Sequence, residues 1–221
     1  MTEFAALDNE IELSHYDPDT TLTQLSAELD SFRLTSGLKS SGCKGCGGCC
    51  SDNIPVLGPD IDMLLKGFGL GLEQAAGELF IMPEKPDIKA RRKAISEMSE
   101  SARISQLEAA LLFEYNNAEP IILAKQDTGE CCLLKNNMCS HYMIRPYSCG
   151  LYLCDMGERL SYIQEMIIRQ GTWYAYAKLG WISESEIPHN PFLKSDSYDK
   201  LLISDFEFKL DNTLDQLFFY F

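Results

Sequence analysis

Basic residues are scarce in this sequence. Its 221 residues include 19 lysines and arginines against 33 aspartates and glutamates, which gives a formal net charge of −14 at pH 7. A chain this acidic is repelled by nucleic acid phosphates and by anionic lipid surfaces. The short basic cluster at 89–93 is followed by Glu97 and Glu100, and is typical of a solvated helix face. We therefore expect no nucleic acid partner and no membrane partner.

Long apolar runs are missing as well. No stretch approaches the ~18 consecutive apolar residues of a transmembrane helix. Residues 1–10 carry acidic residues and lack the basic and apolar regions of a secretory signal. These absences predict a cytoplasmic protein, in a compartment that keeps thiols reduced. The apolar content of 45% still suffices for an ordinary hydrophobic core, so a metal would be added to a body that already folds.

Recognisable catalytic arrangements are also lacking. The serine, histidine and carboxylate residues show no spacing that indicates a triad. The glycines at 67, 69 and 71 follow an expected helix rather than a strand, which argues against a phosphate-binding loop. Whether the chain is an enzyme therefore stays open at this point.

Cysteine, by contrast, is abundant and strongly clustered. Nine cysteines cannot pair off completely, and a reducing compartment disfavours disulfides. Four of them fall within the glycine-rich stretch 43–50, which argues against their being merely small core residues. The clustering predicts a metal centre. The eight expected ligands are Cys43, Cys46, Cys49, Cys50, Cys131, Cys139, Cys149 and Cys154.

The first group has the spacing Cys-x2-Cys-x2-Cys-Cys over residues 43–50. Its glycines let the backbone curl tightly and expose amides that can hydrogen-bond sulfur. The same Cys-x2-Cys-x2-Cys spacing occurs in bacterial ferredoxins. Adjacent cysteines rarely bind one ion together, so Cys49 and Cys50 serve different centres or one of them only supports the other.

The second group is spaced more loosely, and its placement matters more than its spacing. Residues 120–124 and 131–134 are expected to form strands, with turns at 127–129 and 135–137. This hairpin would bring Cys131 close to Cys139. Cys132 is expected to pack rather than to bind metal. His141 is a possible ligand, although a lone loop histidine is more often a hydrogen-bonding residue.

Two metal assignments stay open. Three thiolates at regular Cys-x2-Cys spacing favour an iron–sulfur cluster, of the 4Fe–4S type, in a protein that transfers electrons or assists a modification reaction. Such a protein would act with a protein or redox partner. The alternative is Zn²⁺ in a structural interaction module without catalysis, since eight thiols complete two four-coordinate sites.

The expected fold class is α+β and mostly helical, with helices around the glycine-rich cysteine loop and a small β-hairpin. Residues 1–40 form an acidic segment with one helix over 20–33, capped by Asp19 or Thr20. Residues 41–156 form the metal-binding domain. Residues 157–221 form a helical segment that packs on it. Further helices are predicted at 59–65, 72–78, 87–116, 157–179 and within 199–221.

Two ordered motifs lie at a defined separation. The first is the 43–50 group followed by Ile54 and a helix near Asp60. The second comprises Gly129, Cys131, Leu133, Leu134, Cys139, Tyr142, Arg145, Pro146, Cys149, Tyr152 and Cys154. Over roughly half of the chain these motifs resemble the YkgJ-type cysteine-cluster family, whose members are described by a zinc- or iron-chelating domain. The resemblance implies metal chelation more firmly than any reaction.

Flagellin lysine methylases carry similar cysteine motifs and are associated with an iron–sulfur cluster, which implies redox or methyl-transfer chemistry as a further expectation. This chain departs from the family pattern at two positions, because Gly150 replaces the usual arginine and His141 replaces an aliphatic residue. Cys131, rather than Cys132, occupies the family position.

Overall fold

The computed structural model describes residues 2–38, 48–87, 97, 118–187 and 189–206. Cys43 and Cys46 lie outside these ranges, as do nearly all of the helix expected over 87–116 and the tail from residue 207.

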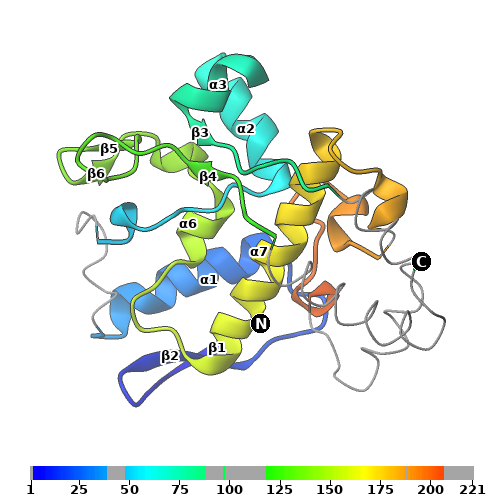
Figure 1. Cartoon of the computed structure of the whole chain (residues 1–221). Helices are drawn as coiled ribbons and strands as arrows, with labels where there is room; N and C mark the ends of the chain where they lie inside the picture. The colour runs from blue at the N-terminus through cyan, green and yellow to red at the C-terminus, as the bar shows by residue number, and fades with distance from the viewer. Residues whose placement is uncertain (1, 39–47, 88–96, 98–117, 188, 207–221) are drawn as a thin grey trace.

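The described residues form a mostly helical α+β fold, which confirms the predicted fold class (Figure 1). The α-helices are α1 (Leu22–Thr35), α2 (Gly58–Phe68), α3 (Leu72–Glu78), α6 (Tyr147–Leu151) and α7 (Glu158–Lys178). Three antiparallel pairs of strands accompany them: β1 (Glu3–Leu7) with β2 (Glu10–His15), β3 (Phe80–Ile81) with β4 (Ile122–Leu123), and β5 (Leu134–Lys135) with β6 (Met138–Cys139). Short 3-10 turns are η2 (Gly48–Ser51), η3 (Tyr142–Ile144), η4 (Glu184–Glu186), η5 (Pro191–Leu193) and η6 (Ile203–Asp205).

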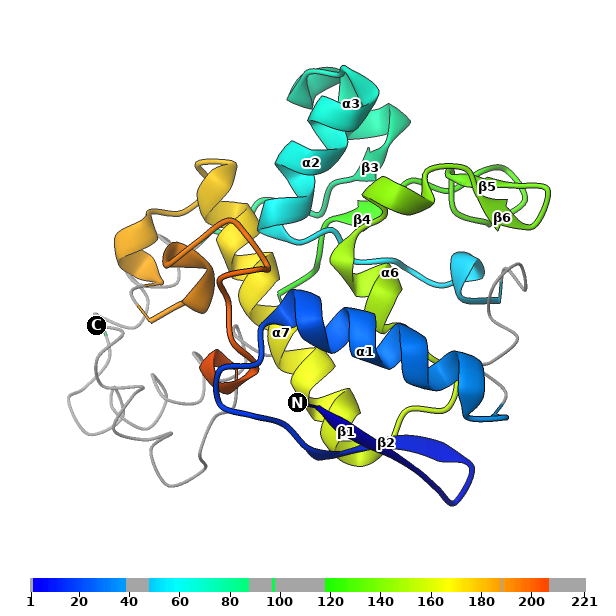
Figure 2. The same ribbon diagram turned by 180° about the vertical axis from the view of Figure 1, so that it is seen from behind.

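Helix α7 runs through the middle of the described fold (Figure 2), and α2 packs against it. It matches the helix predicted over 157–179, and Gly180 ends it with a φ of +66°. Many of its side chains are buried in a hydrophobic core that also includes residues near both ends of the described chain, such as Ile11 and Phe206. The core therefore draws on all three expected segments. No helix in the described ranges is long and apolar enough to cross a bilayer.

Helix α1 confirms the predicted helix, with Leu22, Leu25 and Leu29 buried on one face. The predicted cap was wrong, because Thr21 caps the helix instead of Asp19 or Thr20. The Gln24 amide donates to the Thr21 hydroxyl at 3.2 Å, and the Gln24 side chain accepts from the Thr21 amide at 2.8 Å. This reciprocal capping box needs a glutamine three residues after the cap, and that spacing selects Thr21.

The hairpin β1–β2 was not predicted from the sequence. Asp8 and Asn9 both have positive φ, at 50° and 67°, as a two-residue turn of the I′ type requires. Ile11 and Leu13 alternate inward on β2 and are buried. The Asp-Asn pair followed by this alternation was the available signal, and the acidic residues between the apolar positions obscured it.

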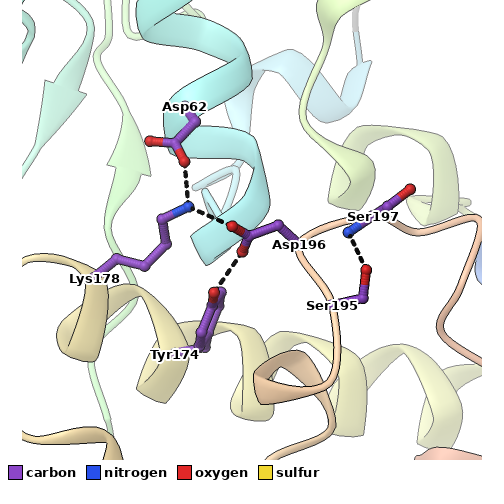
Figure 3. A network of polar contacts seen from close by, with 6 residues as sticks. All are labelled: Asp62, Tyr174, Lys178, Ser195, Asp196 and Ser197. Carbon is purple, nitrogen blue, oxygen red and sulfur yellow. Dashed lines mark hydrogen bonds and ion pairs between the residues drawn. The ribbon is translucent and has the colours of Figure 1, made fainter.

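A polar network ties α2, α7 and the segment 195–197 together (Figure 3). The Lys178 ammonium on α7 pairs with Asp62 on α2 and also with Asp196, at 3.3 Å. The Tyr174 hydroxyl donates to Asp196 at 2.5 Å, and Ser197 donates its amide to Ser195 at 3.0 Å. The contacts of Lys178 and Tyr174 thus connect α7 to α2 and to the segment 195–197.

The α2–α7 crossing itself depends on two glycines. A Cβ added at Gly58 would lie 2.3 Å from a ring carbon of Tyr174, and one added at Gly171 would lie 2.9 Å from the side chain of Leu57. Real Cβ contacts are not this short, so any side chain at either position pushes the helices apart. Glycine permits the close approach that buries both helices.

We expect Gly58→Ala to lower the free energy of unfolding by about 1–3 kcal/mol, the usual cost of overfilling a tight core. Gly71→Ala is the matched control, because a Cβ there meets nothing within 4 Å. Thermal unfolding of the two variants measures the difference, and an equal melting temperature for both contradicts the role assigned to Gly58.

Candidate metal centre

Seven of the nine cysteines lie in the described residues, and all seven are free thiols. Cys49 and Cys50 lie on η2, Cys139 lies on β6, and Cys149 lies in α6. Cys131 and Cys132 precede β5, and Cys154 follows α6.

A main-chain hydrogen bond joins the two cysteine groups. The amide of Cys131 donates to the carbonyl of Cys50 at 2.7 Å. The Lys125 ammonium donates to the carbonyl of Ser51 at 2.5 Å, and Lys125 forms a single β-bridge with Cys131. The end of the first group is therefore held against the start of the second, although the two are far apart in the sequence.

Cys131 and Cys132 lie in a tight turn. The amide of Leu134 donates to the Cys131 carbonyl at 2.9 Å, and the amide of Leu133 donates to the Cys131 sulfur at 3.4 Å. The continuous strand predicted over 131–134 was therefore wrong, because these residues close this turn before β5 begins at Leu134. A hydrogen bond from the Cys131 thiol to the Cys132 sulfur raises the pKa of Cys131 and lowers the pKa of Cys132, and burial raises the pKa of Cys131 further.

The turn predicted at 135–137 is confirmed. Asn136 and Asn137 have positive φ, at 52° and 59°, and connect β5 directly to β6. Cys139 on β6 pairs with Leu134 on β5. A negative charge on Cys139 raises the pKa of Cys132, an effect smaller than that of the hydrogen bond from Cys131, which lowers it.

Cys149, in α6, interacts electrostatically with two of these thiols. Burial raises its pKa well above the ordinary value for a thiol, and nearby negative charges on Cys131, Asp60 and Cys139 act in the same direction. Arg145 opposes the rise with its positive charge. The thiol of Cys149 thus lies within electrostatic reach of both Cys131 and Cys139.

One hydrophobic cluster supports five of these thiols. Ile54, Val56, Ile61 and Leu64 form part of this cluster. The cysteines that belong to it or pack against it are Cys50, Cys131, Cys132, Cys139 and Cys149. In both ribbon views η2 lies close to the β5–β6 hairpin and to α6 (Figures 1 and 2). We call these five residues the thiol group.

Of the described cysteines, Cys49 and Cys154 are not part of the thiol group. Cys154 is exposed, just before the main chain pairs with Ile11 on β2. Cys49 is close enough to Tyr152 that its charge raises the pKa of that phenol, after the larger effects of burial and Asp52. Of the expected ligands that are described, Cys50, Cys131, Cys139 and Cys149 belong to this cluster or pack against it.

Arg145 is held beside the thiol group by α1. Its guanidinium pairs with Asp30 at 3.1 Å and lies 4.0 Å from the centre of the Tyr142 ring. A Cβ at the neighbouring Gly150 would lie 2.9 Å from the Ser26 hydroxyl oxygen of α1. Gly150, where the resemblance leads one to expect arginine, therefore allows α6 to approach α1 closely.

His141 has other contacts in this structure. Its Nδ1 lies 2.9 Å from the hydroxyl oxygen of Ser140, and its ring packs on Phe68 with centroids 4.4 Å apart. Both contacts fit the hydrogen-bonding alternative that the sequence favours.

The donor chemistry of the thiol group suits a soft metal. Cysteine thiolates are the ligands of iron–sulfur clusters and of structural zinc. Among the described residues, no three or more cysteine, histidine or carboxylate side chains already stand in an arrangement that could hold a metal ion. Cys43 and Cys46, which belong to the first group, are outside that part of the chain.

Asp60 anchors the helix that carries Cys149, a role that sequence reasoning missed. One carboxylate oxygen accepts from the Tyr147 amide at 3.1 Å and from the Tyr198 hydroxyl at 2.9 Å, and the other accepts from the Leu57 amide at 3.1 Å. Tyr147 and Tyr198 stack with ring centroids 4.2 Å apart. From sequence alone, Asp60 indicates only an acidic first turn of α2.

Comparisons of the chain with family models, with curated proteins and with solved structures found no match. The resemblance to the YkgJ-type family therefore stays a prediction.

The buried carboxyl of Asp60 makes stability depend on pH. Burial raises its pKa from 3.8 to about 6, although its three hydrogen bonds oppose the rise. The folded state thus binds this proton more tightly than the unfolded state does. The resulting stabilisation is complete below about pH 4 and is lost as the pH rises through about 6, by about 3 kcal/mol in all.

We expect the stability advantage of the wild type over Asp60→Asn to shrink by up to about 3 kcal/mol between pH 4 and pH 7. Chemical denaturation at several pH values measures it, with Asp62→Asn, an exposed position of the same helix, as the control. A constant difference between wild type and Asp60→Asn across this range contradicts the prediction.

Proposed function

We propose that the thiol group is the core of a metal centre, and that this centre holds an iron–sulfur cluster of the 4Fe–4S type. The observation that carries the proposal is the convergence of reduced cysteines from η2, from the 131–139 hairpin region and from α6 on one hydrophobic cluster. Separate segments of the chain thus contribute cysteines to this one cluster.

The electrostatics of the thiol group favour the binding of a cation. Cys131 and Cys149 have raised pKa values, so neither gives up its proton readily without compensation. Metal binding replaces those protons, and the bound cation then offsets the charge of the thiolates. Arg145 adds fixed positive charge beside Cys149.

Iron–sulfur chemistry is favoured by the number of thiols and by their hydrogen bonds. Five thiols of the described residues belong to or pack against one hydrophobic cluster, which is more than one tetrahedral zinc ion uses. The amide of Leu133 points at the Cys131 sulfur, and such bonds set the reduction potential of thiolate-bound clusters. In this proposal the cytoplasmic protein transfers electrons to a protein partner or assists a modification enzyme.

One observation favours zinc as a second candidate. The thiol group includes residues of η2, of the β5–β6 hairpin region and of α6, which are all short elements. A closed four-thiolate zinc site would cross-link these three segments and stabilise their packing. That protein would be an interaction module without catalysis.

We expect anaerobically purified protein to be brown, to absorb broadly in the visible and to contain iron and acid-labile sulfide in equal amounts. Cys149→Ala should lose most of this iron, because it removes one of the expected thiolate ligands in the group. Thr128→Ala, at an exposed turn, is the control. Colourless protein that retains zinc supports the second candidate, and protein without any bound metal contradicts both.

A further inference from the structure

We propose that the turn of the β1–β2 hairpin of one copy of this chain docks on an exposed apolar surface of a second copy. We call that surface the η3 surface, and its residues are Met138, Tyr142, Met143, Lys66 and Lys135. The proposal goes beyond the metal centre and does not depend on it. It rests on the exposure and the charges of these two parts of the molecule.

The η3 surface has an apolar centre that is open to solvent. Met143 is 91% exposed, Met138 is 61% exposed and Tyr142 is 41% exposed. All three lie within six consecutive residues. Single exposed apolar residues are normal on a protein, but a group of them marks an interaction site. Methionine and tyrosine are also enriched in the centres of protein–protein interfaces.

Packing on the end of α2 holds the η3 surface in place. A Cβ added at Gly67 of α2 would lie 2.4 Å from the Cδ1 atom of Ile144, so η3 and α2 are in close contact. The rings of Phe68 and His141 pack beside this contact, with centroids 4.4 Å apart. The exposed Lys66 therefore lies next to η3. A surface that is held in this way loses less conformational freedom when it binds.

The charge of the η3 surface is opposite to that of the whole chain. Residues 131–154 include no aspartate or glutamate, although the chain has 33 acidic residues. Lys66 and Lys135 are exposed, and neither pairs with a carboxylate in the part of the chain that the structure describes. An apolar side chain with carboxylates beside it would complement this surface.

The turn of the β1–β2 hairpin has these features. Leu7, at the end of β1, is 55% exposed. The next residues, Asp8 to Glu10, are exposed as well, and neither of the two carboxylates pairs with a cation among the described residues. The positive φ of Asp8 and Asn9 keeps the turn tight. In the proposed contact Leu7 meets the apolar centre, and the two carboxylates face the two lysines.

The hairpin turn and the η3 surface lie toward opposite ends of the fold. Both ribbon views place β1–β2 at the bottom and β5–β6 toward the top (Figures 1 and 2). The hairpin therefore meets the η3 surface of another copy rather than its own. Each contact leaves one hairpin and one η3 surface free, so association continues into chains or closes into rings. At physiological salt, charges more than about 8 Å apart are largely screened, which limits the repulsion between two acidic chains.

Sedimentation velocity of the full-length protein tests the proposal. The protein is kept anaerobic and reduced, so that no disulfide joins two copies, at about 0.15 M salt. We expect the average mass to rise with protein concentration beyond that of a dimer. A chain that stays monomeric up to about 1 mM, where even weak contacts are populated, overturns the proposal. Growth that stops at a dimer overturns it as well.

A substitution in the apolar centre tests the η3 surface. Met143→Asp should weaken association at least about tenfold, because it places a carboxylate where an apolar side chain is expected to dock. Leu34→Asp is the matched control, since Leu34 is 57% exposed on α1 and belongs to neither docking surface. Circular dichroism confirms that both variants fold. Equal association of the two variants overturns the proposal.

An exchange of charges tests the hairpin as the occupant. Lys135→Glu and Glu10→Lys should each weaken association about two- to fivefold, the range of an exposed ion pair. The two substitutions in one chain should restore it, because the pair is then reversed and the net charge is that of the wild type. Failure of this restoration overturns the proposal. An effect of Met143→Asp without any effect of Glu10→Lys also overturns it, since another part of the chain then occupies the η3 surface.

Discussion

The carboxylate of Asp60 has no exposed surface and lies where α2, the start of α6 and the segment around Tyr198 meet. Burying a carboxylate is unfavourable unless its oxygens are hydrogen-bonded, and here they accept three bonds. Each of these bonds fixes a different part of the chain. Together with the bonds from Tyr147 to Leu22 and from Ser148 to Pro55, this side chain sets the orientation of α6, and with it the placement of Cys149. Gly58 then brings α2 close enough to α7 to bury the arrangement.

The charges around the thiol group are also set by burial and hydrogen bonding. Cys131 and Cys149 lie in surroundings that favour the protonated thiol, whereas Cys132 accepts a hydrogen bond that favours its thiolate. Arg145, held by Asp30 of α1, is the nearby fixed positive charge that lowers the pKa of Cys149. A group of this kind is poorly balanced by the protein alone, and in the proposed function a bound cation completes it. This imbalance is the physical reason to connect the geometry with metal chemistry.

Sequence reasoning succeeded where the signal was local. The periodic leucines of α1 and the apolar spacing of α7 predicted both helices, and the asparagines at 136 and 137 predicted the turn before Cys139. It failed where several local signals competed. Thr20 and Thr21 are both acceptable caps, and only the reciprocal bond with Gln24 selects Thr21. The strand expected at Cys131 became a turn, because backbone partners at Cys50 and Ala124 hold its first two residues.

The sequence alone indicates the clustering of cysteines into two groups, the reduced state expected for them and the soft-metal chemistry that they imply. These inferences rest on residue types and short spacings, which depend on no contact between distant parts of the chain. Which sulfurs meet is a different question, because it depends on how α2, α6 and η2 pack. The bond from Cys131 to Cys50, the approach of Cys149 and the exposure of Cys154 all arise from that packing.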